Sequence, residues 1–97
     1  MPSEAVAPLR DMLRHIELAE AFVQGFDRPA FLADLRTQFA VTRCLEIVSE
    51  ASRRLPAELK ARRSEIPWRQ MAAAGNVYRH DYEDVAAQFV WDTLCDA

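Results

Sequence analysis

The chain has 97 residues, of which 51% are hydrophobic and 28% charged, and it contains only two Gly and five Pro. This composition is that of a folded globular protein, and the length predicts one domain over residues 1–97 while excluding a large two-lobed enzyme. Fifteen acidic and twelve basic residues give a net charge of -3, which argues against coating nucleic acid by bulk electrostatics. Any RNA contact must therefore be local.

The cysteines and the apolar runs indicate the compartment. Cys44 and Cys95 are far apart in the sequence and form no CxxC pair or Cys/His cluster, so they predict neither a zinc site nor a disulfide scaffold. No apolar run approaches the roughly 18 residues of a membrane span, and the first residues lack the layout of a signal peptide. We expect a cytoplasmic protein without membrane association.

The first half of the chain predicts two long helices. Apolar residues recur every three or four positions over residues 6–24, which indicates an amphipathic helix that ends at Gly25. A second helix is predicted to begin with Asp27 as its cap and to continue to Leu55, where Pro56 interrupts it. Because the connection between them is short, these two helices are expected to pack antiparallel.

The second half predicts further helices over residues 56–63 and 68–81 and from about residue 83 onward. No alternating pattern bounded by turn residues occurs, so strands have almost no support. We therefore expect an all-α, up-and-down bundle of four to five helices.

The stretch 75–82 is the segment best suited to chemistry. Polar side chains form a row on one side of the predicted helix. The row consists of Arg69, Asn76, His80 and Glu83, which lie within roughly 60° of one another around the helix axis. An imidazole here can move a proton near neutral pH, an amide can orient it or a phosphate oxygen, and an Arg can stabilise a phosphorane. The alternative interpretation is the solvated face of an amphipathic helix.

Aromatic residues divide in the same way. Tyr78 falls on the core face of this helix, whereas Tyr82 lies just past its end and is a candidate for modification. Trp68, Phe89 and Trp91 are interpreted as anchors in the core or a subunit interface rather than as a platform for stacking bases.

Three runs of sequence carry a resemblance to a known family. They are residues 37–51 (TQFAV and, one residue later, RCLEIVSEA), Leu55-Pro56, and residues 65–72 (EIPWRQMA). With these runs, most of the chain resembles the HepT-like branch of the HEPN superfamily. Members of this branch are small helical proteins paired in bacterial operons with a minimal nucleotidyltransferase.

The family's active motif is Arg, four residues, His, one residue and Tyr. The His matches His80, the Tyr matches Tyr82, and the polar residue that commonly follows the motif Arg matches Asn76, but Gly75 stands where the Arg is expected. The resemblance implies a homodimer whose two motifs meet in a cleft and cleave RNA with no metal or other cofactor. It also implies that the nucleotidyltransferase, acting as antitoxin, adds AMP to Tyr82.

Three functions remain open. The first is a HEPN-type toxin, a metal-independent endoribonuclease in which His80 is the proton shuttle, Asn76 orients the scissile group, and Arg79 or Arg69 replaces the motif Arg. Arg79 is slightly favoured because it adjoins His80. The second is a catalytically degenerate dimer that is a binding partner or substrate of the nucleotidyltransferase, which Gly75 favours. The third is a helical bundle with a purely structural role in assembly.

Overall fold

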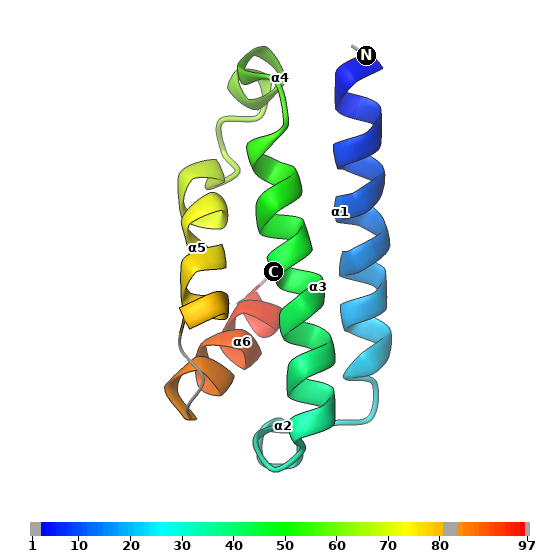
Figure 1. The fold of residues 1–97 in the computed structure, drawn as a ribbon, viewed down its shortest axis with the longest axis vertical. Helices are drawn as coiled ribbons and strands as arrows, with labels where there is room; N and C mark the ends of the chain where they lie inside the picture. The colour runs from blue at the N-terminus through cyan, green and yellow to red at the C-terminus, as the bar shows by residue number, and fades with distance from the viewer. Residues whose placement is uncertain (1–2, 81–83, 97) are drawn as a thin grey trace.

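The computed structural model describes residues 3–80 and 84–96, and within them it contains helices and no strand. In chain order the helices are α1 (Ser3–Phe22), α2 (Arg28–Leu32), α3 (Leu35–Arg53), α4 (Ala57–Arg62), α5 (Trp68–His80) and α6 (Asp84–Asp96). α1 and α3 lie side by side and antiparallel, and α5 packs on the other side of α3 (Figure 1). The expected all-α, up-and-down architecture is therefore confirmed.

The core lies on both sides of α3. One cluster of buried residues joins α1 to α3 near the ends that face α4, and it consists of Ala5, Met12, Val48, Ala51 and Leu55. The other joins α1, α2, α3 and α6, and it consists of Ala19, Phe31, Val41, Cys44, Leu45 and Val90. Burial of each large apolar side chain contributes about 1.5–3 kcal/mol. α3 is therefore the element on which the other helices are positioned.

The turn after α1 agrees with the sequence. Gly25 has a φ of 84°, in the left-handed region that favours glycine. Asp27 caps the next helix, because its carboxylate accepts a hydrogen bond from the N–H of Ala30 at 2.9 Å. Pro29 follows in the first turn of α2, where backbone N–H groups have no acceptor within the helix, so the absence of an N–H in proline costs no hydrogen bond.

The expected single helix from Asp27 to Leu55 is wrong, because the chain breaks between α2 and α3. The carboxylate of Asp34 accepts a hydrogen bond from the N–H of Thr37 at 3.2 Å and caps α3. A capping Asp competes with the helix for backbone amides and starts a new helix instead. The side chain of Gln38 then donates to the carbonyls of Phe31 and Leu32 at 2.9 and 3.0 Å, which satisfies the end of α2.

The three aromatic residues assigned to a core or interface all pack against the core. Trp68 borders the cluster at the α4 end, and Phe89 and Trp91 border the other. The rings of Trp91 and Phe31 are 5.2 Å apart and inclined at 38°, which attaches α6 to α2. No helix in the described ranges is long and apolar enough to cross a membrane.

Candidate functional site

The residues singled out by sequence lie on or next to α5. The backbones of Asn76, Arg79 and His80 belong to its last two turns, while their side chains are outside the described structure. Tyr82 lies outside the described residues altogether. Arg69 is in the first turn of α5 and is exposed, as its place in the predicted polar row requires.

The opposite side of α5 is apolar and faces the bundle. Met71 packs against one core cluster and Ala74 against the other, whereas the side chain of Tyr78, predicted on this core side, lies outside the described structure. Gly75 is also buried. Ala72 is half-buried at the edge of this face and Ala73 is exposed. These two neighbouring alanines therefore differ in their surroundings, since Ala72 meets α3 and Ala73 is exposed to solvent.

α3 and α5 meet through one serine. Ser49 is only 2% exposed, and its hydroxyl donates to the carbonyl of Ala72 at 3.0 Å. The same Oγ accepts a hydrogen bond from the N–H of Gly75 at 3.2 Å. The backbone at position 75, where the family motif has Arg, is therefore held against α3. A side chain at position 75 would leave the helix beside this contact, about 100° round the helix from Asn76 of the polar row.

Arg53, one turn further along α3, reaches the same carbonyl. Its Nη2 donates to the oxygen of Ala72 at 2.6 Å. Sequence reasoning missed both Arg53 and Ser49. The available signal was that Ser49 and Ser52 interrupt the buried stripe of α3, and a buried hydroxyl requires a hydrogen-bond partner.

The beginning of α5 borders a shallow hollow against α4. The indole N–H of Trp68 is 3.1 Å from the carbonyl oxygens of Lys60 and Arg63, which ties the end of α4 to the start of α5. The hollow beside this contact is lined by Ala57, Lys60, Ala61, Ser64, Pro67, Trp68, Arg69 and Gln70. Lys60 and Arg69 are the two charged side chains among these lining residues.

The helix also sets the distance between Arg69 and the motif. Eleven residues separate Arg69 from His80, and at 1.5 Å per residue they span about 16 Å of helix. Arg79, the neighbour of His80 in the sequence, is much nearer to it along the helix. Within residues 3–80 and 84–96 there is no group of three or more His, Cys, Asp or Glu side chains that could hold a metal ion.

The helices and the motif at the end of α5 define a HEPN-like helical bundle. The chain belongs to the ribonuclease HepT-like family, whose model matches residues 12–97. This match confirms the family resemblance found in the sequence.

Relatives cover most of the chain. A probable ribonuclease HepT from Thermococcus cleftensis is 42% identical over 86 residues, which are 89% of this chain and 78% of that protein. A provisionally assigned RNase from Methanocaldococcus jannaschii is 32% identical over 95 residues, 97% of this chain and 78% of its own length. Another, from Caldanaerobacter subterraneus, is 30% identical over 86 residues, 89% of this chain and 77% of its own length. No solved structure matches the chain.

Proposed function

We propose that the protein is a HEPN-type endoribonuclease and the toxin of a toxin–antitoxin pair. The observation that carries the proposal is the course of α5, which continues without a break to His80 in a chain of the HepT-like family. Because the helix is continuous, Asn76 and His80 are one turn apart on the same side of it. Relatives named as ribonucleases support the same reaction.

The reaction needs proton transfer and fixed positive charge but no metal. His80 of one protomer takes the proton from a ribose 2′-hydroxyl, whose oxygen forms a bond to phosphorus while the bond to the 5′-oxygen breaks. The leaving 5′-oxygen takes a proton from the second His80 of the dimer. Asn76 orients the scissile group and Arg79 stabilises the charge on the phosphorane. Arg69 is the weaker candidate for this charge because of its distance along α5.

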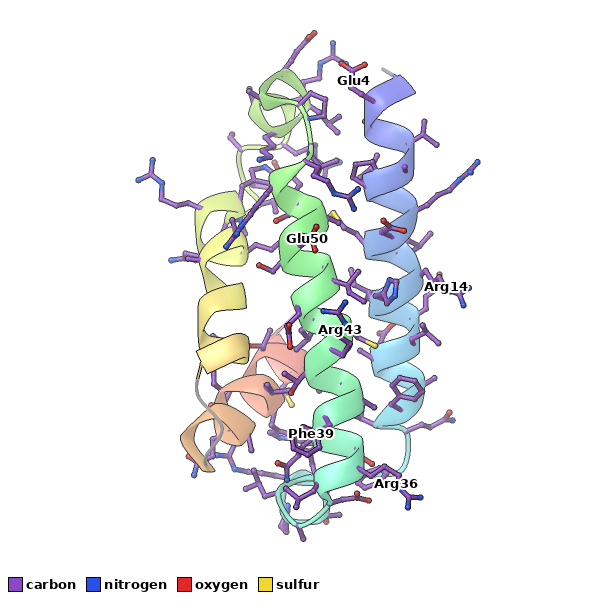
Figure 2. All side chains as sticks on the ribbon, in the orientation of Figure 1. Glu4, Arg14, Arg36, Phe39, Arg43 and Glu50 are labelled. Atoms are coloured by element: carbon purple, nitrogen blue, oxygen red, sulfur yellow. The ribbon has the colours of Figure 1, made fainter. Side chains whose placement is uncertain are left out.

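The apolar residues that the fold leaves uncovered support a homodimer. Leu35 and Phe39 on α3 are 65% and 66% exposed, and Leu13 on α1 is 60% exposed. Phe39 lies on the face of α3 turned to the viewer in Figure 2, together with Arg43 and Glu50. A two-fold contact through this face would hide the apolar surface and pair the opposite charges of the two copies.

This face of α3 extends to the level of the motif. α3 and α5 run in opposite directions, and α5 ends beside the middle of α3 (Figure 1). A two-fold axis through this face, which includes Arg43, would bring the two motifs toward each other. We expect light scattering to give a dimer for the wild type and about half that mass for Phe39→Asp. A wild-type mass near 11 kDa would contradict the dimer, and an unchanged mass for Phe39→Asp would contradict this interface.

The silencing reaction is transfer of AMP to Tyr82 by a cognate nucleotidyltransferase, the antitoxin. The phenol oxygen attacks the α-phosphorus of ATP and pyrophosphate leaves, which places a bulky anion beside the motif and repels RNA phosphates. Incubation with the neighbouring gene's product, ATP and Mg²⁺ should label the wild type and Tyr78→Phe. Equal labelling of Tyr82→Phe would contradict the assignment.

The second candidate function is a catalytically degenerate dimer that serves only as partner or substrate of the nucleotidyltransferase. The burial of Gly75 against Ser49 favours it, because no cation occupies the motif position. RNA digestion in EDTA separates the two functions. We expect the wild type to cleave, and His80→Ala and Arg79→Ala to lose on the order of 10²-fold or more.

Each outcome of that digestion has a clear meaning. A wild type that cleaves nothing but still accepts AMP on Tyr82 is the degenerate partner. Cleavage by His80→Ala at the wild-type rate would show that the proposed site is wrong. Arg69→Ala tests the other candidate, because a larger loss of rate than in Arg79→Ala would assign the role of the motif Arg to Arg69.

A further inference from the structure

The guanidinium of Arg53 lies at the surface of α5 next to the motif. Its hydrogen bond ends on the carbonyl of Ala72, which is four residues before Asn76. A helix carbonyl points along the axis toward the N–H four residues later, so the guanidinium is held one turn from Asn76. At about 100° per residue, Ala72 lies within roughly 60° of both Asn76 and Arg69, and Arg53 therefore borders the polar row.

The charge of Arg53 is held without being neutralised. Five other arginines pair with a carboxylate within 4.0 Å, namely Arg28, Arg43, Arg54, Arg62 and Arg63. Arg53 makes no such salt bridge to any group in the described part of the chain. A neutral carbonyl fixes one N–H of its guanidinium instead, and a guanidinium has five N–H donors. The guanidinium is therefore held in place by the carbonyl of Ala72, and its positive charge and remaining N–H groups are available to bind an anion.

The distance along α5 decides which phosphate it would bind. Ala72 and His80 are eight residues apart, about 12 Å of helix. The guanidinium, at the carbonyl of Ala72, lies about two turns of helix before His80, where a phosphate that flanks the scissile one would pass. Two further cations, Arg69 of α5 and Lys60 of α4, line the hollow between α4 and α5, on the side of Ala72 away from His80. Because the net charge of the chain is -3, a local group of cations is what RNA contact requires.

We propose that Arg53 binds a phosphate of the RNA next to the scissile bond, and thereby contributes to substrate affinity rather than to the chemical step. This inference rests on the proposed ribonuclease function and assigns it a binding residue on α3. Arg53 is therefore a substrate-binding residue, with a role distinct from those of His80 and Arg79. Loss of a contact that is equal in ground state and transition state raises KM and leaves kcat unchanged.

The test compares Arg53→Gln with Arg54→Gln. Both variants remove one exposed charge at the end of α3, but Arg54 pairs with Asp11 of α1 on the other side of the helix. Binding of a single-stranded RNA with 2′-O-methyl riboses, which cannot be cleaved, is measured by fluorescence anisotropy at several salt concentrations. We expect Arg53→Gln to bind about tenfold more weakly, the typical effect of one charged hydrogen bond. The slope of log Kd against log salt should fall by about 0.7 in Arg53→Gln and stay unchanged in Arg54→Gln.

Cleavage kinetics and thermal melting complete the test. Arg53→Gln should raise KM with kcat within about twofold of wild type, and Arg53→Lys should recover most of the salt slope. Equal slopes for Arg53→Gln and wild type would overturn the inference, and a lowered melting temperature with an unchanged slope would identify Arg53 as a clamp between α3 and α5. Either result leaves the ribonuclease proposal standing if the wild type cleaves RNA. A wild type that neither binds nor cleaves RNA would overturn both.

Discussion

The N–H of Gly75 and the Oγ of Ser49 are 3.2 Å apart across the contact between α5 and α3. Ser49 also donates to Ala72, so a single buried hydroxyl holds two successive turns of α5. In the HepT-like pattern an Arg would occupy position 75. Here the backbone at that position faces α3. Restoring the motif by Gly75→Arg would therefore place a large side chain next to a packed helix.

Gly75→Arg is predicted to destabilise the fold by about 2–4 kcal/mol. A long cationic side chain would start from a buried contact, where overpacking costs about 1–3 kcal/mol and an unpaired charge adds to it. Urea unfolding followed by circular dichroism measures the difference. Gly75→Ala is the control, because it adds one methyl group and gains up to about 1 kcal/mol of helix propensity. A Gly75→Arg variant that is as stable as Gly75→Ala and cleaves RNA faster than wild type would contradict this view of position 75.

The sequence predicted the helices well but misjudged where two of them meet. Leu35 and Phe39 continue the apolar period of the preceding residues, which indicated one long helix. In the structure these two side chains are 65% and 66% exposed, so the pattern marked an uncovered surface and not a core face. The residue that indicates the helix break is Asp34, the N-cap of α3. The apolar period runs through this position without interruption, so the period alone does not show the break.

The candidate site was predicted as far as local spacing allows. The 3.6-residue period predicted a polar row on α5, of which the structure describes one side chain, Arg69, and that side chain is exposed as expected. Ser49 and Arg53 were missed because they meet Ala72 from 23 and 19 residues away along the chain. Contacts at such separations depend on how α3 and α5 pack, and a single helix pattern does not contain that information.

The cap of α3 gives a second prediction. Asp34→Ala should cost about 1 kcal/mol of unfolding free energy, because the N–H of Thr37 loses its acceptor. Asp34→Asn keeps a capping oxygen and should lose only a small part of this. Urea midpoints of the two variants measured at one pH make the comparison. Equal loss in both variants would show that the charge, and not the cap, is what stabilises the turn.

The two cysteines should differ in reactivity. Cys44 is buried and its burial raises the pKa of the thiol, so less thiolate is present at a given pH. Cys95 is exposed. A disulfide reagent at pH 8 should therefore label one thiol quickly and the second only after addition of urea. Cys95→Ser should abolish the fast phase, whereas a fast phase that persists in this variant would contradict the burial of Cys44.

The attachment of α6 gives the last prediction, since an aromatic contact and an ion pair both join it to α2. Phe31 is fully buried and stacks with Trp91, whereas Arg28 and Asp92 form a salt bridge of 2.8 Å between exposed side chains. Removal of a buried aromatic ring typically costs about 3–5 kcal/mol, and an exposed ion pair contributes about 0–1 kcal/mol.

Phe31→Ala should therefore lower the unfolding free energy several times more than Asp92→Asn. Hydrogen exchange locates the effect, and the amides of α6 should lose protection in Phe31→Ala before those of the contact between α1 and α3, because α6 packs mainly against α2 and α3. Asp92→Asn should leave this pattern as in the wild type. A loss of protection in α6 that is equal in the two variants would mean that the ion pair, and not the aromatic contact, holds α6 in place.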